Sequence, residues 1–130
     1  MTPLLYPLLA IAAQAEQPDC ANAMSQSELN QCAALDFERE DAALNAAWRD
    51  VLAYVRSRDA EGIPEWDPRG TGEARLREAQ RAWIAFRDAH CELVGFEARG
   101  GTMEPMIYDG CRAEVTRART EQLRFILGEP

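Results

Sequence analysis

Few side chains in this chain of 130 residues could carry out chemistry by themselves. His90 is the single histidine and all 14 basic residues are arginine, which excludes Schiff-base chemistry and removes most metal sites and triads. None of the three serines lies near His90 in sequence, and no glycine-rich phosphate loop occurs. We therefore expect no catalytic residue, no bound metal and no cofactor. A glycosidase-like pair among the 22 acidic residues stays open as an alternative.

The acidic residues dominate the charge of the chain. They outnumber the arginines and give a net charge of −8 and an isoelectric point near 4.7. Such a charge argues against binding nucleic acid and favours cationic partners. The length fits one domain, and 47% hydrophobic residues are typical of a globular chain.

The N-terminus has the features of a secretory signal. Leu4–Ala13 is an apolar run too short to span a bilayer, and Ala13-Gln14-Ala15 has the small-x-small pattern that signal peptidase reads. We expect cleavage after Ala15 and a single domain over residues 16–130. The product would be periplasmic or secreted, and soluble without a membrane span. A short N-terminal helix packed on the domain is the alternative.

Four cysteines remain after the expected cleavage, at Cys20, Cys32, Cys91 and Cys111. An even number of cysteines in a small exported protein predicts disulfides, and four cysteines allow three connectivities. Pairing neighbours in sequence closes the smallest loops, which favours Cys20–Cys32 and Cys91–Cys111. A structural zinc is the alternative, but it would want close pairs such as C-x-x-C, which do not occur.

Three amphipathic segments follow. Ser25-Gln26-Ser27-Glu28 has the form of a capping box and predicts the start of a helix that continues to about Ser57. Gly62–Gly72, with two prolines and three glycines, must end it. The apolar residues of this helix recur at steps of three and four: Leu29, Ala33, Phe37, Leu44, Trp48, Val51 and Val55.

A second helix is expected over residues 73–97, a break over 99–105, and a third helix from about Asp109. The expected inner face of the second helix contains Leu76, Ala79, Trp83, His90 and Val94. That of the third contains Cys111, Val115, Ala118, Gln122, Phe125 and Ile126. No segment shows sustained period-two alternation. The sequence therefore predicts an all-α fold, a three-helix antiparallel bundle stapled by two disulfides at both ends of its helices.

Polar residues interrupt two of these faces. Glu40 falls on the inner face of the first helix with Asp41 at its edge, and Gln80, Arg87 and His90 fall within the stripe of the second. A buried arginine needs an anion, so we expect Arg87 to pair with Glu40 or Asp41 and Gln80 to fill the remaining hydrogen-bond sites. A carboxylate active site assisted by Arg87 and His90 is the alternative.

Several motifs of the chain recur together in a known family. They are Cys20, Asn30-x-Cys32-Ala33, Asp41-x-x-Leu44-Asn45, Leu76-x-x-Ala79-Gln80-Arg81-x-Trp83-Ile84-x-Phe86-Arg87-Asp88-Ala89-x-Cys91, Gly100-Gly101-Thr102 and Cys111. With these motifs the chain resembles the LprI-like domain, a family of small exported bacterial proteins named for a lysozyme inhibitor, from Cys20 to about Leu127. Two departures stand out: the namesake is a lipoprotein whereas Cys20 lacks a lipid-attachment context, and Gly62–Gly72 looks individual.

The resemblance implies an all-helical periplasmic domain and, for some members, inhibition of c-type lysozyme. Such lysozymes are strongly cationic, so an acidic domain would be steered towards them or towards another cationic protein. A cell-envelope interaction domain without an enzyme target is the alternative function.

Two surfaces are candidates for binding such a partner. One is the acidic cluster Asp36, Glu38 and Asp41, which could equally be a solvated helix face. The other is a protruding loop, which could insert into a cleft or merely turn the chain. One such loop runs from Gly100 to Tyr108 and includes Gly101, Thr102 and Glu104. Gly62–Gly72, with Trp66 and Arg69, is a second loop of this kind.

Overall fold

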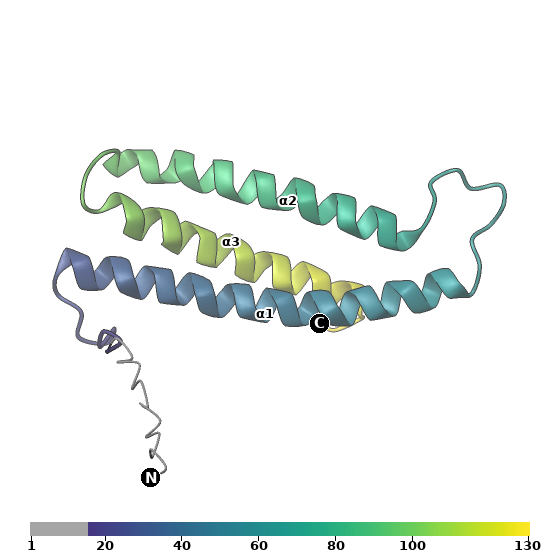
Figure 1. Ribbon diagram of the computed structural model, residues 1–130, viewed down its shortest axis with the longest axis horizontal. Coiled ribbons are helices and arrows are strands. Elements are labelled where there is room, and N and C mark those ends of the chain that lie inside the picture. Colours follow the sequence, from purple (N-terminus) through teal and green to yellow (C-terminus); the bar gives the residue numbers. More distant parts are fainter. Residues whose placement is uncertain (1–15) are drawn as a thin grey trace, which may run out of the picture.

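The computed structural model describes residues 16–130, and the expected leader, residues 1–15, lies outside this range. Within it the chain forms three α-helices and no strand: α1 (Gln26–Ala60), α2 (Gly72–Gly95) and α3 (Glu104–Ile126), with a short 3-10 helix η1 (Phe96–Ala98) after α2. The helices run up, down and up, so that α2 is antiparallel to both others (Figure 1). The predicted three-helix bundle is confirmed. None of the described helices is both long and apolar enough to cross a membrane.

The capping box that opens α1 is present. The Ser25 hydroxyl accepts a hydrogen bond from the Glu28 amide at 3.2 Å, and the Glu28 carboxylate accepts from the amides of Ser25 and Met24, each at 3.0 Å. These amides have no partner within the helix, so the side chains satisfy them. The bonds from Ser25 and Met24 lower the pKa of Glu28.

Both predicted disulfides form, Cys20–Cys32 with a Cα–Cα distance of 5.7 Å and Cys91–Cys111 with one of 5.5 Å. The expectation that they staple both ends of the bundle is wrong. The start of α1, the end of α2 and the start of α3 all meet at one end, so both bridges lie there (Figure 1). An up-down-up topology imposes this arrangement, because the second and third helices are joined where the first begins.

The opposite end is closed by the loop over residues 61–71 and by a cap on α2. The Asp59 carboxylate accepts hydrogen bonds from the amides of Gly72 at 2.8 Å and Glu73 at 3.0 Å, and the Thr71 hydroxyl accepts from the Ala74 amide at 3.0 Å. A Cβ at Gly72 would lie 2.9 Å from a methyl of Val55, so only glycine allows this close approach. The carboxylate of α1 thereby fixes the start of α2.

The core lies between all three helices. The predicted inner residues of α1 are buried or half-buried, whereas Ala79 and His90 of α2 are exposed and the expectation for these two is wrong. Leu76 and Arg87 of α2 are buried as predicted, and Cys91 is buried beside them. The buried apolar cluster consists of Leu44, Ala47, Val51, Leu76 and Leu123, flanked by Trp48, Leu52, Val55, Trp83 and Leu127.

The third helix begins earlier than the sequence indicates. α3 starts at Glu104 rather than near Asp109, with Pro105 in its first turn. Proline is tolerated there because its missing N–H would have no partner within the helix anyway. Treating Pro105 as a helix breaker therefore misplaced the start of α3 by one turn and a half.

The inner face of α3 also differs from the prediction. Ala118, Gln122, Phe125 and Ile126 are exposed. Buried instead are Ala113, Thr116, Thr120 and Leu123. The Thr120 hydroxyl donates to the Thr116 carbonyl at 3.2 Å, so a residue that reads as polar in sequence packs as a β-branched side chain with its hydroxyl satisfied.

We predict that the two disulfides contribute unequally to stability. Replacing Cys91 and Cys111 by alanine should lower the free energy of unfolding by about 3 kcal/mol, because a loop of this length is freed in the unfolded chain and the fully buried Cys91 loses packing. Replacing Cys20 and Cys32 should cost less, because Cys20 is exposed. Urea denaturation of both variants provides the measurement, and an equal or larger loss for Cys20–Cys32 would contradict the prediction.

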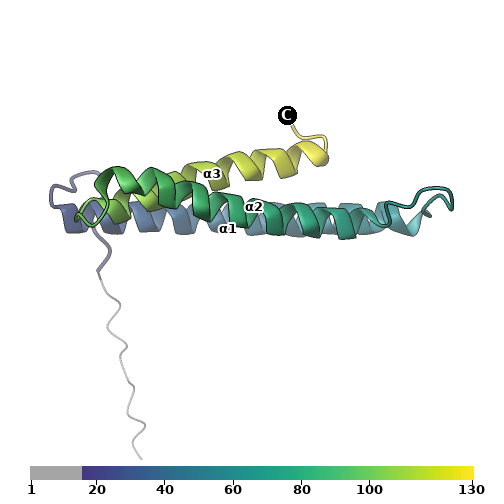
Figure 2. The same cartoon turned by 90° about the horizontal axis from the view of Figure 1, so that it is seen from above.

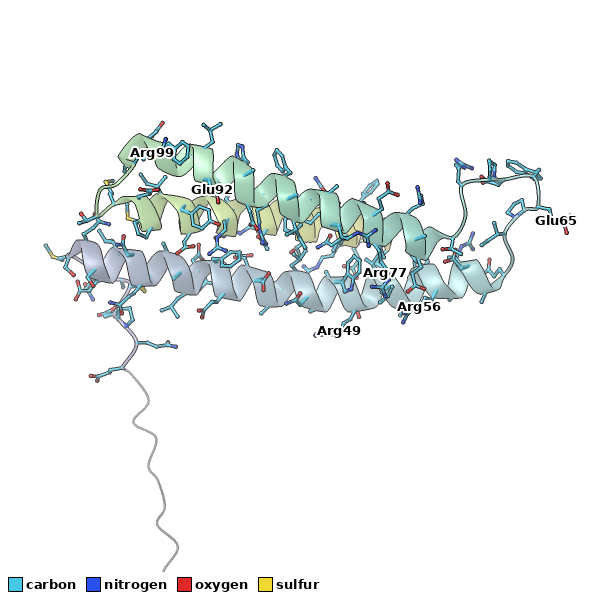
Figure 3. The ribbon with its side chains drawn as sticks, turned by 45° about the horizontal axis from the view of Figure 1, so that its top comes forward. Arg49, Arg56, Glu65, Arg77, Glu92 and Arg99 are labelled. Carbon is cyan, nitrogen blue, oxygen red and sulfur yellow. A yellow bond between two sulfur atoms is a disulfide. The ribbon has the colours of Figure 1, made fainter. Side chains whose placement is uncertain are left out.

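We also predict that stability depends on the charge of Glu73. Hydrogen bonds from Arg56 at 2.8 Å and Arg77 at 3.0 Å hold the pKa of this carboxyl below its ordinary 4.5 (Figure 3). A lowered pKa in the folded state adds stability above the unfolded pKa, and this stability is lost as pH falls through the folded pKa. The free energy of unfolding should therefore drop between about pH 5 and pH 3.

Glu73→Gln tests this origin. The variant should be less stable near neutral pH and should lose less stability on acidification than the wild type. Glu38→Gln, which alters an exposed carboxylate that forms no ion pair with residues 16–130, is the matched control and should follow the wild-type curve. Parallel pH profiles for wild type and Glu73→Gln in urea titrations would show that other carboxylates are responsible.

Candidate functional site

Arginine side chains and aromatic rings alternate through the middle of the bundle. Arg87 of α2 lies 5.0 Å from the Trp83 ring and 5.2 Å from the Phe37 ring of α1. Arg112 of α3 lies 3.8 Å from the same Phe37 ring and 4.5 Å from that of Tyr108. These five residues, which we call the arginine–aromatic ladder, join all three helices through cation–π contacts.

Arg87 is the most buried charge of the ladder, at 8% exposed. Its Nε donates to Asp88 at 2.9 Å and its Nη1 donates to the Thr116 hydroxyl at 3.4 Å. The Asp41 carboxylate lies 3.9 Å from Nη1. The guanidinium therefore exchanges its water shell for two carboxylates, a hydroxyl and two ring faces, which is the condition for burying such a charge.

Glu40 and Gln80 lie outside this set of contacts. Glu40 accepts from Arg117 of α3 at 3.0 Å, and Gln80 accepts from Arg119 at 3.1 Å instead of filling sites around Arg87. Because successive residues of a helix point about 100° apart, Asp41 can face α2 while its neighbour Glu40 faces α3. The four residues of the expected network therefore do not form one cluster. Asp41 lies beside Arg87 of α2, whereas Glu40 and Gln80 each bind an arginine of α3.

The acidic cluster of α1 is partly paired with arginines. Asp36 pairs with Arg39 and lies 4.0 Å from Arg117, while Asp41 lies 3.9 Å from Arg87. Of the three acids only Glu38 forms no ion pair with a residue of the described range, and it is exposed. Two of the three acids therefore already have an arginine of the same chain beside them.

The expectation of a protruding loop over residues 100–108 is wrong. Only a short turn, residues 99–103, separates η1 from α3, and Tyr108 belongs to the helix. Gly100 has a φ of 76°, which favours glycine, and its amide donates to the Glu104 carboxylate at 2.6 Å. The Thr102 carbonyl accepts from Asn30 of α1 at 2.9 Å. The turn is thus fastened to the bundle rather than projecting from it.

A hollow of about 510 Å³ opens beside this turn, between the end of α2 and the start of α3. Two of its lining residues are carboxylates, Glu92 and Glu104, and within residues 16–130 neither forms an ion pair. Figure 3 shows Glu92 on α2 near the turn that carries Arg99, at the end far from the loop with Glu65. The full lining is Glu92, Gly95, Gly100, Gly101, Glu104, Pro105 and Tyr108.

The remaining candidates contribute little to a site. His90 is exposed and stacks on Phe86 with the ring centres 5.2 Å apart. In the long loop, Trp66 is exposed, but Arg69 is bound by Asp67, and this contact lowers the pKa of Asp67 to about 2. No cluster of three or more histidine, cysteine or carboxylate side chains suited to a metal occurs in the part of the chain that the structure describes.

Comparison with known proteins identifies the family. The sequence matches the family model described as "Lysozyme inhibitor LprI" over residues 19–123. The chain belongs to the LprI family. It is 50% identical over 116 residues to "Uncharacterized protein R02472" of Rhizobium meliloti (strain 1021), covering 88% of this chain and 83% of that protein.

A second relative of this LprI-family chain is "Uncharacterized protein YecT" of Escherichia coli (strain K12), which is 30% identical over 66 residues. That similarity covers 51% of this chain and 40% of the relative. No solved structure gives a significant match. The family match contains both disulfides, the ladder and the hollow.

The sequence analysis missed three residues that the structure places in the ladder, beside it or in the hollow. Arg112 was not singled out, although Tyr108 four residues before it and Asp109 three before it are positions that a helix brings together. The ion pair of Arg112 with Asp109 measures 2.5 Å. Thr116 and Glu92 carried no signal, because an ordinary threonine and an ordinary exposed glutamate gain their roles from the neighbouring helix.

We predict that Arg87→Met destabilises the fold by about 1–2 kcal/mol, because two cation–π contacts and the hydrogen bonds of the guanidinium are lost while the aliphatic stem still packs. Arg81→Met, on an exposed site of the same helix without an ion pair in the described range, should change stability by less than about 0.5 kcal/mol. Thermal and urea denaturation measure both variants. An unchanged free energy of unfolding for Arg87→Met would contradict the role assigned to the ladder.

Proposed function

We propose that this chain is an exported inhibitor of c-type lysozyme. The observation that carries the proposal is the match to the lysozyme-inhibitor family model over residues 19–123. Two disulfides support export, because such bonds persist in oxidising compartments such as the bacterial periplasm. The leader expected over residues 1–15 is part of the same proposal.

The net charge supplies a physical reason for the pairing. An acidic protein of charge −8 attracts a cationic enzyme over several ångströms, which raises the rate of encounter and weakens with salt. Lysozyme also cleaves its substrate with a pair of carboxyl groups in an open cleft. A protein that docks over this cleft prevents the polysaccharide from entering without any chemistry of its own.

The hollow beside the turn is the surface that we assign to this contact. Glu92 and Glu104 approach it from two helices that Cys91–Cys111 ties together, and no arginine of the described range neutralises either one. A hollow with two carboxylates fits an arginine or lysine side chain from the enzyme, whereas Asp36 and Asp41 of the cluster on α1 already lie beside arginines of their own chain. A preformed receptor also costs little ordering on binding.

We predict that Glu92→Gln combined with Glu104→Gln weakens inhibition by roughly 30-fold, since two partly exposed ion pairs at about 1 kcal/mol each are lost. Glutamine keeps the shape of both side chains and an acceptor for the Gly100 amide. The matched control is Glu38→Gln with Glu121→Gln, which removes the same charge at two exposed sites elsewhere. The measurement is the clearing of a bacterial cell-wall suspension by c-type lysozyme at increasing inhibitor concentration.

The outcomes separate the function from the surface. Equal losses in both double variants would place binding in the overall charge rather than in the hollow. No inhibition by the wild type at large molar excess would remove the inhibitor proposal altogether and leave the cell-envelope interaction domain as the function to test.

A further inference from the structure

The outward side of α2 carries an apolar stripe that no described element covers. Within residues 16–130, α1 and α3 both pack on the other side of α2, which forms one edge of the molecule (Figures 1 and 2). The stripe, which we call the α2 seam, consists of Ala79, Ala82, Phe86, Ala89 and Leu93 of α2 and of Phe96, the first residue of η1. All six side chains are exposed, including Phe86 at 57% and Leu93 at 64%.

The spacing of the α2 seam is that of a helix pair. Its members follow one another at steps of three, four, three, four and three residues, which are the a and d positions of a heptad repeat. The inner face of α2, by contrast, uses Leu76, Arg87 and Cys91 to meet α1 and α3. One helix therefore carries two contact faces, of which the fold uses one.

We propose that the α2 seam binds the same seam of a second copy in an antiparallel helix pair. An antiparallel pair sets each a position opposite a d position, and in this register every large side chain meets an alanine. Alanine lets the two helices approach closely enough for the large side chains to fill the space between them. The facing pairs are Phe86 with Ala89, Leu93 with Ala82, and Phe96 with Ala79, each occurring twice about the two-fold axis.

The charges at the two ends of the α2 seam suit this register. Arg75 and Glu78 lie at its beginning, and Glu97 and Arg99 lie at its end, where Arg99 rests 4.2 Å above the ring of Phe96. Arg75 and Glu78 pair with each other at 2.7 Å within the chain. Antiparallel pairing brings Arg99 of the other copy towards Glu78 and Glu97 of the other copy towards Arg75. Antiparallel helix dipoles also attract.

The size of the α2 seam sets the strength of the dimer. Seventeen residues separate its first and last members, which corresponds to about 26 Å of helix. A strip of this length and one helix wide falls at the low end of specific interfaces, below roughly 800 Å² per partner. We therefore expect a dimer that dissociates on dilution rather than an obligate one, with each monomer folded by its own core.

The association can be tested on the purified, disulfide-bonded protein by sedimentation velocity from about 1 μM to about 1 mM. The wild type should shift from monomer to dimer over this range. Phe86→Glu and Leu93→Glu, each at an exposed site, should stay monomeric throughout with unchanged circular dichroism. Phe125→Glu, which places the same charge on an aromatic residue of α3 that is 78% exposed, is the matched control and should dimerise like the wild type.

A size exchange tests the register. Ala82→Leu should weaken association by roughly tenfold or more by crowding Leu93 of the other copy, and Leu93→Ala should do so by leaving a gap. The double variant restores one large and one small side chain in each layer, so its dissociation constant should return to within roughly threefold of the wild type.

Three results would overturn the proposal. The first is a wild type that stays monomeric up to about 1 mM, which would leave the α2 seam to another partner. The second is a dimer abolished by Phe125→Glu but not by Phe86→Glu. The third is a double size-exchange variant that is as weak as the worse single variant.

Discussion

The packing of two arginines, one buried and one half-buried, against aromatic rings is the constraint on which the rest of this bundle depends. A guanidinium group leaves water at little cost only where carboxylates, hydroxyls and ring faces replace its hydration together. Phe37 provides a ring face for both Arg87 and Arg112, at 5.2 and 3.8 Å, so a single side chain of α1 contacts both α2 and α3. The apolar cluster around Val51 supplies much of the burial, while the ladder specifies which faces meet.

The ladder also shapes the surface beside it. Arg112 lies 4.5 Å from the ring of Tyr108, which is a wall of the hollow that holds Glu92 and Glu104. Cys91–Cys111 joins the same two helices, and Asn30 fastens the intervening turn to α1 at 2.9 Å. The hollow is therefore held by a disulfide, a cation–π contact and a hydrogen bond. This preorganisation makes it a receptor for a side chain of another protein instead of a loop that must order on binding.

The distribution of charge separates the parts of the molecule that are already satisfied from those that are open. Most arginines of α1 and of the loop end face carboxylates, as Arg56 and Arg77 do with Glu73. The acidic excess is left at other sites, with Glu92 and Glu104 beside the turn. The α2 seam is an apolar counterpart, since its rings remain exposed and no other helix of the described range covers them. The two surfaces use different chemistry and would suit different partners.

The sequence by itself determined the helical class, the capping box at Ser25, both disulfides and the burial of Arg87 beside a carboxylate of α1, with Glu40 and Asp41 left open, because each depends on local spacing or on the cost of an isolated charge. It did not determine which side of α3 is inward. Periodicity favoured Phe125 and Ile126, whereas the fold buries Thr116 and Thr120, whose hydroxyls are satisfied only when Arg87 and the helix carbonyls are in place. The start of α3 at Glu104 and the hollow with Glu92 likewise arise from contacts between helices. Amphipathic spacing shows that a helix has a buried side, but only the packing of its neighbours decides which side that is.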